Sequence, residues 1–256
     1  MENEPLIYIV PDVHGRKFWR FLKNHKTDKP IVFLGDYLDP YGFEGITPED
    51  AIENFKEILQ FKKDNPEQVT LLLGNHDCEY ALSKRICYCR CDDENYPEIQ
   101  DMFRNNWDWF KMVYEFKNKD TRWLLSHAGV NPKWMENWSF KKDDIGKFNE
   151  WLNRKDSKFI TSLESVSRFR GGWDYDGSPV WADIREYEWK TKEDMEKIGY
   201  DRQVCGHTYL NGSHLTFDSI TCIDCQKVFY INGHKALENL TRSACKFYIN
   251  PYFLVP

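Results

Sequence analysis

Five short blocks of the sequence carry side chains that can bind metal ions or transfer protons. Four of them directly follow an apolar, β-branched or leucine-rich run, as expected for residues at the end of a buried strand. In chain order the blocks are Asp12-Val13-His14, Gly35-Asp36-Tyr37-Leu38-Asp39, Gly74-Asn75-His76-Asp77, Ser126-His127-Ala128-Gly129 and Gly206-His207-Thr208. Carboxylate, imidazole and amide groups are ligands for ions such as manganese, iron, zinc and nickel. Two divalent ions need about as many donors as these blocks supply, so the blocks indicate a site with two metal ions.

Each block alone is weak or moderate evidence for such a site. Asp12-x-His14 alone is more commonly explained by structural hydrogen bonds, and Gly35-Asp36-x-x-Asp39 is also weak evidence. Gly74-Asn75-His76-Asp77 after an apolar run is moderately specific. All five blocks in this order, each at the end of its run, argue against coincidence and in favour of one shared site.

Short apolar runs alternate with helical segments in the first half of the chain. A helix is expected after Thr47 as N-cap, with Pro48 at its first position and apolar residues at helical spacing as far as Phe61. Strands are expected over 6–10, 30–35, 69–74 and 123–126. Strands separated by helices predict a parallel sheet, whose carboxyl edge gathers side chains from loops far apart in the sequence. The five blocks are therefore expected to meet at that edge.

Later segments depart from this pattern. Residues 81–120 are polar and aromatic, with a helical pattern over 99–116, and residues 132–170 are helical and charged. Both are expected to form cap-like insertions. Short β-type runs after residue 180 predict a second, antiparallel sheet; they occupy 204–205, 215–217, 220–223, 228–231 and 246–249. The chain shows no internal repeat and no linker, so residues 1–256 are expected to form a single domain.

The composition bounds the class of protein. A net charge of −6 argues against a nucleic-acid-binding surface driven by bulk charge. An anionic substrate is still compatible with it, because bound metal ions would dominate the local field. The acidic N-terminus is unlike a secretory signal, and no apolar stretch approaches the ~20 residues that span a bilayer. We therefore expect a cytoplasmic protein without a membrane partner; the sequence gives no indication of its oligomeric state.

The ordered blocks resemble those of the metallophosphoesterase superfamily, the calcineurin-like phosphoesterases. The resemblance extends from Asp12 to about Ile231. Within the superfamily, the chain is most similar to the serine/threonine phosphoprotein phosphatases and the bacterial diadenosine tetraphosphatases. One reason is that the residue three positions after His207 is Leu210 rather than a second histidine. The resemblance implies an α/β fold with two central mixed β-sheets sandwiched between helices, and a helical cap insertion.

The resemblance also implies a set of metal ligands. The first ion would be held by Asp12, His14 and Asp36. The second would be held by Asp36, Asn75, His127 and His207, with Asp36 bridging the two. We expect manganese first, with iron, zinc or nickel as alternatives, since the same nitrogen and oxygen donors accept all of them.

Two further residues have implied roles in proton transfer. His76 would act as the general acid and Asp39 would orient it. An imidazole paired with a carboxylate can protonate a leaving alkoxide or phosphate near neutral pH.

The chain departs from the family pattern at Pro40. Phosphoprotein phosphatases have Arg-Gly after Gly-Asp-x-x-Asp, and that arginine binds the substrate phosphate through a bidentate guanidinium. Proline cannot do so. Candidates to replace it are Arg16, Arg168, Arg170 and Arg185. Arg170, next to two glycines, is preferred, and a solvated surface arginine is the alternative for each.

These features predict a two-metal-dependent phosphoesterase. It would hydrolyse a phosphomonoester (phosphoprotein or small molecule) or a nucleotide polyphosphate by attack of a metal-bridging hydroxide. One alternative is a catalytically silent interaction scaffold, although every expected ligand and His76 are present. The other is a phosphodiesterase acting on nucleic acid, which the acidic charge disfavours.

Overall fold

The computed structural model describes residues 5–82, 89–232 and 237–239, which form two β-sheets packed face to face. The first sheet has six strands in the order β11 (Leu237–Asn239), β10 (Phe229–Asn232), β1 (Pro5–Val10), β2 (Ile31–Phe33), β3 (Val69–Leu72) and β4 (Phe110–Lys111). Strands β1 to β4 are parallel, while β10 runs antiparallel to β1 and β11 antiparallel to β10. The sheet is therefore mixed, with its parallel part formed by the early apolar runs.

The second sheet has five strands in the order β5 (Val113–Asn118), β6 (Thr121–Ser126), β7 (Arg202–Cys205), β9 (Ile220–Cys222) and β8 (Leu215–Phe217). Its three central strands, β6, β7 and β9, are parallel, and only the edge strands β5 and β8 are antiparallel. The prediction of an antiparallel second sheet is therefore wrong. The connection between β6 and β7 is long and helical, and such a crossover allows neighbouring strands to run in the same direction.

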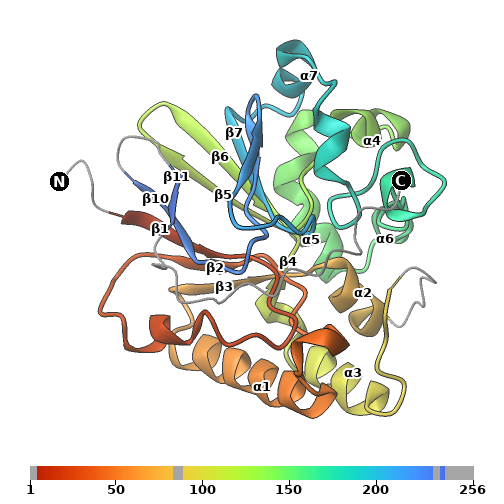
Figure 1. The fold of residues 1–256 in the computed structure, drawn as a ribbon. Coiled ribbons are helices and arrows are strands. Elements are labelled where there is room, and N and C mark those ends of the chain that lie inside the picture. Colours follow the sequence, from red (N-terminus) through yellow and green to blue (C-terminus); the bar gives the residue numbers. More distant parts are fainter. Residues whose placement is uncertain (1–4, 83–88, 233–236, 240–256) are drawn as a thin grey trace.

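Helices cover the outer sides of the two sheets (Figure 1). The α-helices are α1 (Pro48–Asp64), α2 (Asn75–Ala81), α3 (Tyr96–Asn105), α4 (Pro132–Asn137), α5 (Phe148–Asn153), α6 (Ser157–Ser162) and α7 (Lys192–Glu196). The 3-10 helices are η1 (Arg20–Asn24), η2 (Gly42–Glu44), η3 (Trp107–Trp109), η4 (Lys142–Lys147), η5 (Arg168–Arg170) and η6 (Ile184–Tyr187). Helices α1 and α3 lie beside the first sheet, and α4 to α6 lie on the side of the second (Figure 1). No helix among the described residues is long and apolar enough to cross a bilayer.

The start of α1 follows the sequence prediction. The Thr47 side chain accepts a hydrogen bond from the Asp50 N–H at 3.1 Å, and Pro48 occupies the first turn. This capping box satisfies backbone donors that the helix itself leaves free. The predicted N-cap is confirmed.

The side chains of β1 alternate between two buried hydrophobic layers, one on each face of the first sheet. Ile7 and Ile9 belong to the cluster between the two sheets, together with Leu125 of β6. Tyr8 and Val10 belong to the cluster on the other face, which includes Phe55 of α1. A strand directs successive side chains to opposite faces, so one uniformly apolar run contributes to both buried layers.

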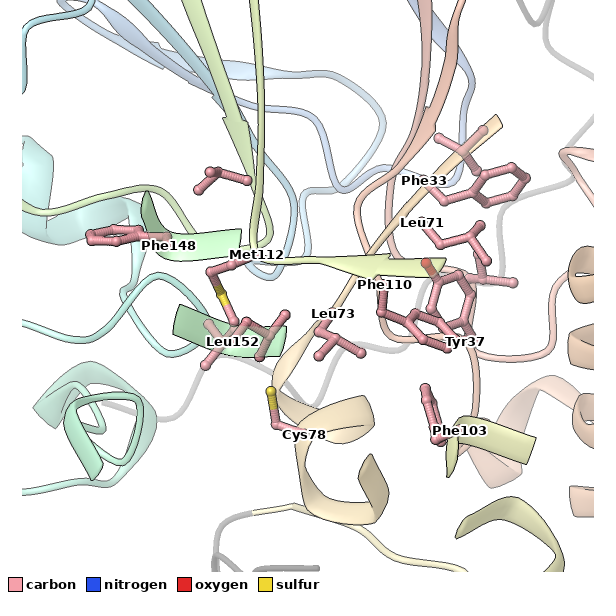
Figure 2. Packing of buried hydrophobic residues seen from close by; sticks show 14 of the residues in the cluster. Phe33, Tyr37, Leu71, Leu73, Cys78, Phe103, Phe110, Met112, Phe148 and Leu152 are labelled. Atoms are coloured by element: carbon pink, nitrogen blue, oxygen red, sulfur yellow. The ribbon is translucent and has the colours of Figure 1, made fainter. Parts of the chain in front are cut away.

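The link between β4 and β5 joins the two sheets. Figure 2 shows Phe110 on β4 beside Tyr37, and Met112 near Phe148 and Leu152. The same hydrophobic cluster therefore extends from beneath the first sheet to the helices beside the second.

Some segments adopt a structure different from the one predicted from the sequence. The helix predicted over 99–116 is wrong beyond Asn105, because β4 and β5 occupy most of 110–118. Aromatic and β-branched residues there pair with β3 and β6, and this pairing outweighs the local helical spacing. The run 228–231 joins the first sheet as β10 rather than the second. The strand predicted over 246–249 lies outside the described residues.

Candidate active site

The ends of five strands bring the predicted ligands together. Each ligand lies within a few residues after a strand: Asp12 and His14 after β1, Asp36 after β2, Asn75 after β3, His127 after β6 and His207 after β7. All six are buried. Three of the strands belong to the first sheet and two to the second, so the site lies where the edges of both sheets converge.

Two groups of possible ligands share Asp36. The first is formed by His14, Asp36 and His76, and the second by Asp36, His127 and His207; within each group the ligand atoms lie within 4.8 Å of one another. Asp36 Oδ2 is 3.5 Å from His14 Nε2 and 3.5 Å from His127 Nε2. One carboxylate oxygen therefore lies between the imidazoles of both groups, as a ligand shared by two ions would.

Donor atoms also converge in the second group. His127 Nε2 is 3.0 Å from Asn75 Oδ1 and 3.1 Å from His207 Nδ1. Buried nitrogen and oxygen donors that lie this close together fit a divalent cation. Such an ion would be bound by all of them at once.

Backbone carbonyls orient two of the imidazoles. His14 Nδ1 is 2.7 Å from the Leu38 carbonyl oxygen, and His127 Nδ1 is 3.0 Å from that of Leu34. An Nδ1–H that donates to a carbonyl leaves Nε2 free to bind a metal. Burial lowers the pKa of both histidines, which favours the neutral form that can bind a metal.

Asp12 and two glycines show how closely the chain packs here. The Asp12 carboxylate accepts the His207 backbone N–H at 2.9 and 3.1 Å. A Cβ at Gly206 would lie 2.1 Å from Asp12 Oδ1, and one at Gly74 would lie 2.1 Å from Asp36 Oδ1. Only glycine permits these approaches, which accounts for the glycines that precede His207 and Asn75.

Four residues of the site adopt left-handed backbone conformations. The φ angles are 43° at His14, 51° at Asp36, 56° at Asp39 and 67° at His207. Aspartate and histidine tolerate this region better than most residues, but it is still strained. The turns after the strands are thus held by surrounding packing.

Asp77 holds the backbone around Asp36 in place through hydrogen bonds. Its carboxylate accepts hydrogen bonds from the backbone N–H groups of Asp36 at 2.7 Å, Gly74 at 2.8 Å and Tyr37 at 3.1 Å. Burial raises the pKa of Asp77 to about 6 despite these donors. The sequence analysis gave Asp77 no role; the available signal was its position three residues after Gly74, where a helix-capping carboxylate is expected.

His76 and Asp39 form a close pair. His76 Nδ1 lies 2.6 Å from Asp39 Oδ2, and the Tyr80 hydroxyl donates to Asp39 Oδ1 at 2.5 Å. Burial alone would lower the pKa of His76, but the charges of Asp36 and Asp39 and the hydrogen bond to Asp39 outweigh it and raise that pKa. The His76 ring lies 5.1 Å from the His14 ring, which belongs to the same group of possible ligands.

Of the predicted arginines, Arg170 contacts the side chain of a possible ligand, and Arg16 donates to the backbone carbonyl of another, Asp12, at 3.4 Å. Its Nε donates to His207 Nε2 at 3.0 Å and lies 3.2 Å from an Asp183 oxygen, and its Nη2 bonds the His207 carbonyl. Arg185 is half exposed and is paired with Asp183. The Arg168 guanidinium stacks over Tyr175 at 4.3 Å.

Arg16, also considered from the sequence, is buried and paired with Glu44 at 2.9 Å. Arg90, an arginine that the sequence analysis missed, lies near the first group. The Arg90 guanidinium is 3.8 Å above the Tyr41 ring, and its Nη2 donates to the Asp39 carbonyl at 2.9 Å. No local spacing pointed to Arg90, because it follows Asp39 by about fifty residues.

Comparisons with known proteins identify a family and a fold. The family model described as "Calcineurin-like phosphoesterase" matches residues 5–211. Serine/threonine-protein phosphatase PP1-delta of Caenorhabditis elegans is 27% identical over 137 residues, which are 52% of this chain but only 42% of that protein. The chain thus matches less than half the length of this curated relative.

A solved structure shows the same fold. It is a protein serine/threonine phosphatase from Saccharomyces cerevisiae with similarity to human phosphatase PP5. It aligns with a TM-score of 0.54 and 14% sequence identity, covering 94% of this chain and 81% of that one. Two mixed sheets between helices are therefore an arrangement that both molecules share.

Proposed function

The chain belongs to the calcineurin-like phosphoesterase family, and we propose that it is a two-metal-dependent phosphoesterase that hydrolyses a phosphomonoester or a nucleotide polyphosphate. The observation that carries the proposal is the position of Asp36 Oδ2, 3.5 Å from an imidazole nitrogen of each ligand group. A carboxylate oxygen close to both sets of donors is what a ligand shared by two ions requires.

The buried donors fit two divalent ions. Asp12, His14 and Asp36 would hold one of them. Asp36, Asn75, His127 and His207 would hold the other. Two such ions lower the pKa of a bound water and neutralise charge that develops on a transferred phosphoryl group. Manganese is our first choice, and iron, zinc and nickel accept the same donors.

The remaining residues of the site bind the phosphate and transfer a proton. Asp39 holds the His76 imidazole by its Nδ1, and the raised pKa favours the protonated ring near neutral pH. His76 would then protonate the leaving oxygen as the ester bond breaks. Arg170, fixed by Asp183 and His207, would orient a phosphate oxygen beside the second group.

The names of the relatives favour phosphoserine or phosphothreonine as substrate. Both the curated relative and the solved structure are described as serine/threonine phosphatases. We therefore propose a phosphorylated protein as the first substrate to test, with small phosphomonoesters and dinucleoside polyphosphates next.

The test is release of phosphate by the metal-reconstituted protein from four compounds: p-nitrophenyl phosphate, bis-p-nitrophenyl phosphate, a phosphopeptide and diadenosine tetraphosphate. We expect turnover of the monoester and a preference for the phosphopeptide. Preference for diadenosine tetraphosphate would change the substrate class but not the chemistry. Two bound ions with no turnover of any of the four would contradict the proposal and favour an interaction scaffold.

A further inference from the structure

We propose that Arg90 binds the phosphate of the substrate next to the first ligand group, although it comes from the segment between α2 and α3 rather than from the turn after β2. The inference rests on the proposed function only in requiring that the ligand carry a phosphate.

Arg90 is fixed in place while remaining accessible. Its guanidinium carbon lies 3.8 Å over the Tyr41 ring, and Nη2 donates to the Asp39 carbonyl at 2.9 Å. The residue is nevertheless exposed. A planar guanidinium held flat on an aromatic ring loses little conformational entropy when it binds an anion, and arginine has five N–H donors, of which the carbonyl uses one.

The Tyr41 ring links Arg90 to the proposed metal site. It packs edge-on against the His14 ring, with centroids 5.1 Å apart. The Asp39 residue that receives the Arg90 hydrogen bond also holds His76. Arg90 therefore contacts two residues that each touch the first ligand group.

Arg90 differs from the neighbouring arginines in its ion pairing. Glu44 pairs with Arg16, while Asp183 pairs with both Arg170 and Arg185. Within residues 5–82, 89–232 and 237–239, no carboxylate lies at ion-pair distance from Arg90. An exposed, oriented and uncompensated guanidinium beside a cluster of metal-binding donors is suited to an anionic ligand.

The position also gives a physical account of the departure at Pro40. The residue after Asp39 carries no cation, but the next residue, Tyr41, supports one that arrives from elsewhere in the chain. Arg170 lies beside the second group and Arg90 beside the first. Arg16 also donates to the Asp12 carbonyl at 3.4 Å and lies 5.4 Å from the Tyr41 ring centre, but it is buried and paired with Glu44.

The test compares Arg90→Ala and Arg90→Lys with Arg154→Ala, a control at the C-cap of α5, where the exposed arginine pairs with Glu150. Calorimetry measures binding of inorganic phosphate to each manganese-loaded protein, and p-nitrophenyl phosphate gives KM and kcat. We expect Arg90→Ala to weaken phosphate binding about 10- to 100-fold, as for loss of a charged hydrogen bond, with a matching rise in KM. Arg90→Lys should bind with intermediate affinity because ammonium cannot donate bidentately. The control should match the wild type.

A second pair of variants tests the aromatic support. Tyr41→Phe keeps the ring under Arg90 and should leave phosphate binding near the wild-type value. Tyr41→Leu removes the ring and should weaken binding several-fold, because the guanidinium is no longer oriented. Equal affinities for these two variants would contradict the role given to Tyr41.

The outcomes separate this inference from the proposed function. If the wild type binds phosphate through Arg90 but hydrolyses no ester, the proposed function fails and the inference stands. If Arg90→Ala binds phosphate and turns over ester as the wild type does, the inference fails and the proposed function stands. Absence of phosphate binding by the wild type would overturn the inference as well.

Discussion

Each proposed metal ligand is buried and follows a strand closely, whereas the arginines beside the site stand outside the sheets and are partly exposed. Asp36 is 2% exposed and is held by the turn after β2, while the Arg170 side chain on η5 is 25% exposed. Arg90 lies between α2 and α3 and is exposed. The two regions therefore differ in what positions them: sheet backbone for the ligands, and contacts between loops for the arginines.

Because of this difference, variants of the two regions should have different functional defects. Changes among the strand-end ligands should alter metal content and kcat, since the proposed ions would supply the chemistry. Changes among the arginines should alter substrate affinity while leaving the ions bound. The following variants test that separation in order of decreasing effect.

Asp36→Asn should have the largest effect. Asparagine tolerates the left-handed backbone at this position, so the fold should persist while one negative charge between the two groups is lost. We expect kcat to fall about 10³-fold or more, because several kcal/mol of transition-state stabilisation are removed. Metal analysis should show fewer than two ions. The exposed Asp101→Asn on α3 is the control, and retention of both ions with full activity in Asp36→Asn would refute the bridging role.

His76→Asn should reduce turnover without removing metal. Loss of a general acid reduces kcat by about 10²- to 10⁴-fold. Elemental analysis should still find the wild-type metal content, since the other donors are intact. A large loss of metal would instead show that His76 is a ligand of the first group.

Arg170→Ala should affect affinity more than chemistry. The guanidinium donates to His207, but the other donors of the second group remain. We expect KM to rise about tenfold, with metal content unchanged, as for loss of one charged hydrogen bond. An unchanged KM with a large fall in kcat would show that Arg170 affects catalysis as the strand-end ligands do.

Asp39→Asn should produce the smallest change, a shift in pH dependence. Burial lowers the pKa of His76, and the charges of Asp36 and Asp39 raise it above the usual value. Removing the Asp39 charge should lower that pKa, so the acid is lost at lower pH. The alkaline limb of kcat/KM against pH should therefore move to lower pH. A profile identical to that of the wild type would argue against His76 as the acid.

The sequence predicted most of the fold and predicted that the candidate ligands lie together. There is a physical reason for this success. Apolar runs such as 6–10 define buried strands, and polar residues that follow them must lie at a sheet edge, so Asp12 and His14 could be placed without knowing the topology. Their roles as ligands stay a prediction. The family and the mixed two-sheet fold are confirmed by the comparisons.

The parts that failed depend on contacts between distant segments. The direction of β6 relative to β7 depends on the crossover between them, which no apolar run encodes. The strands β4 and β5 gain their stability from β3 and β6 rather than from local preference. Arg90 was missed for the same reason, because its partner Tyr41 is about fifty residues away.

The left-handed turns have a consequence for how this chain responds to selection. Of the nine non-glycine residues with positive φ in the described chain, four are His14, Asp36, Asp39 and His207. Each such conformation costs on the order of 1 kcal/mol, which glycine would relieve. A glycine would also remove a buried hydrogen bond at each of these positions, and such a loss costs about 1–3 kcal/mol. A library screened only for resistance to heat would therefore have little to gain at these four positions, because the strain and the contacts that offset it belong to the same side chains.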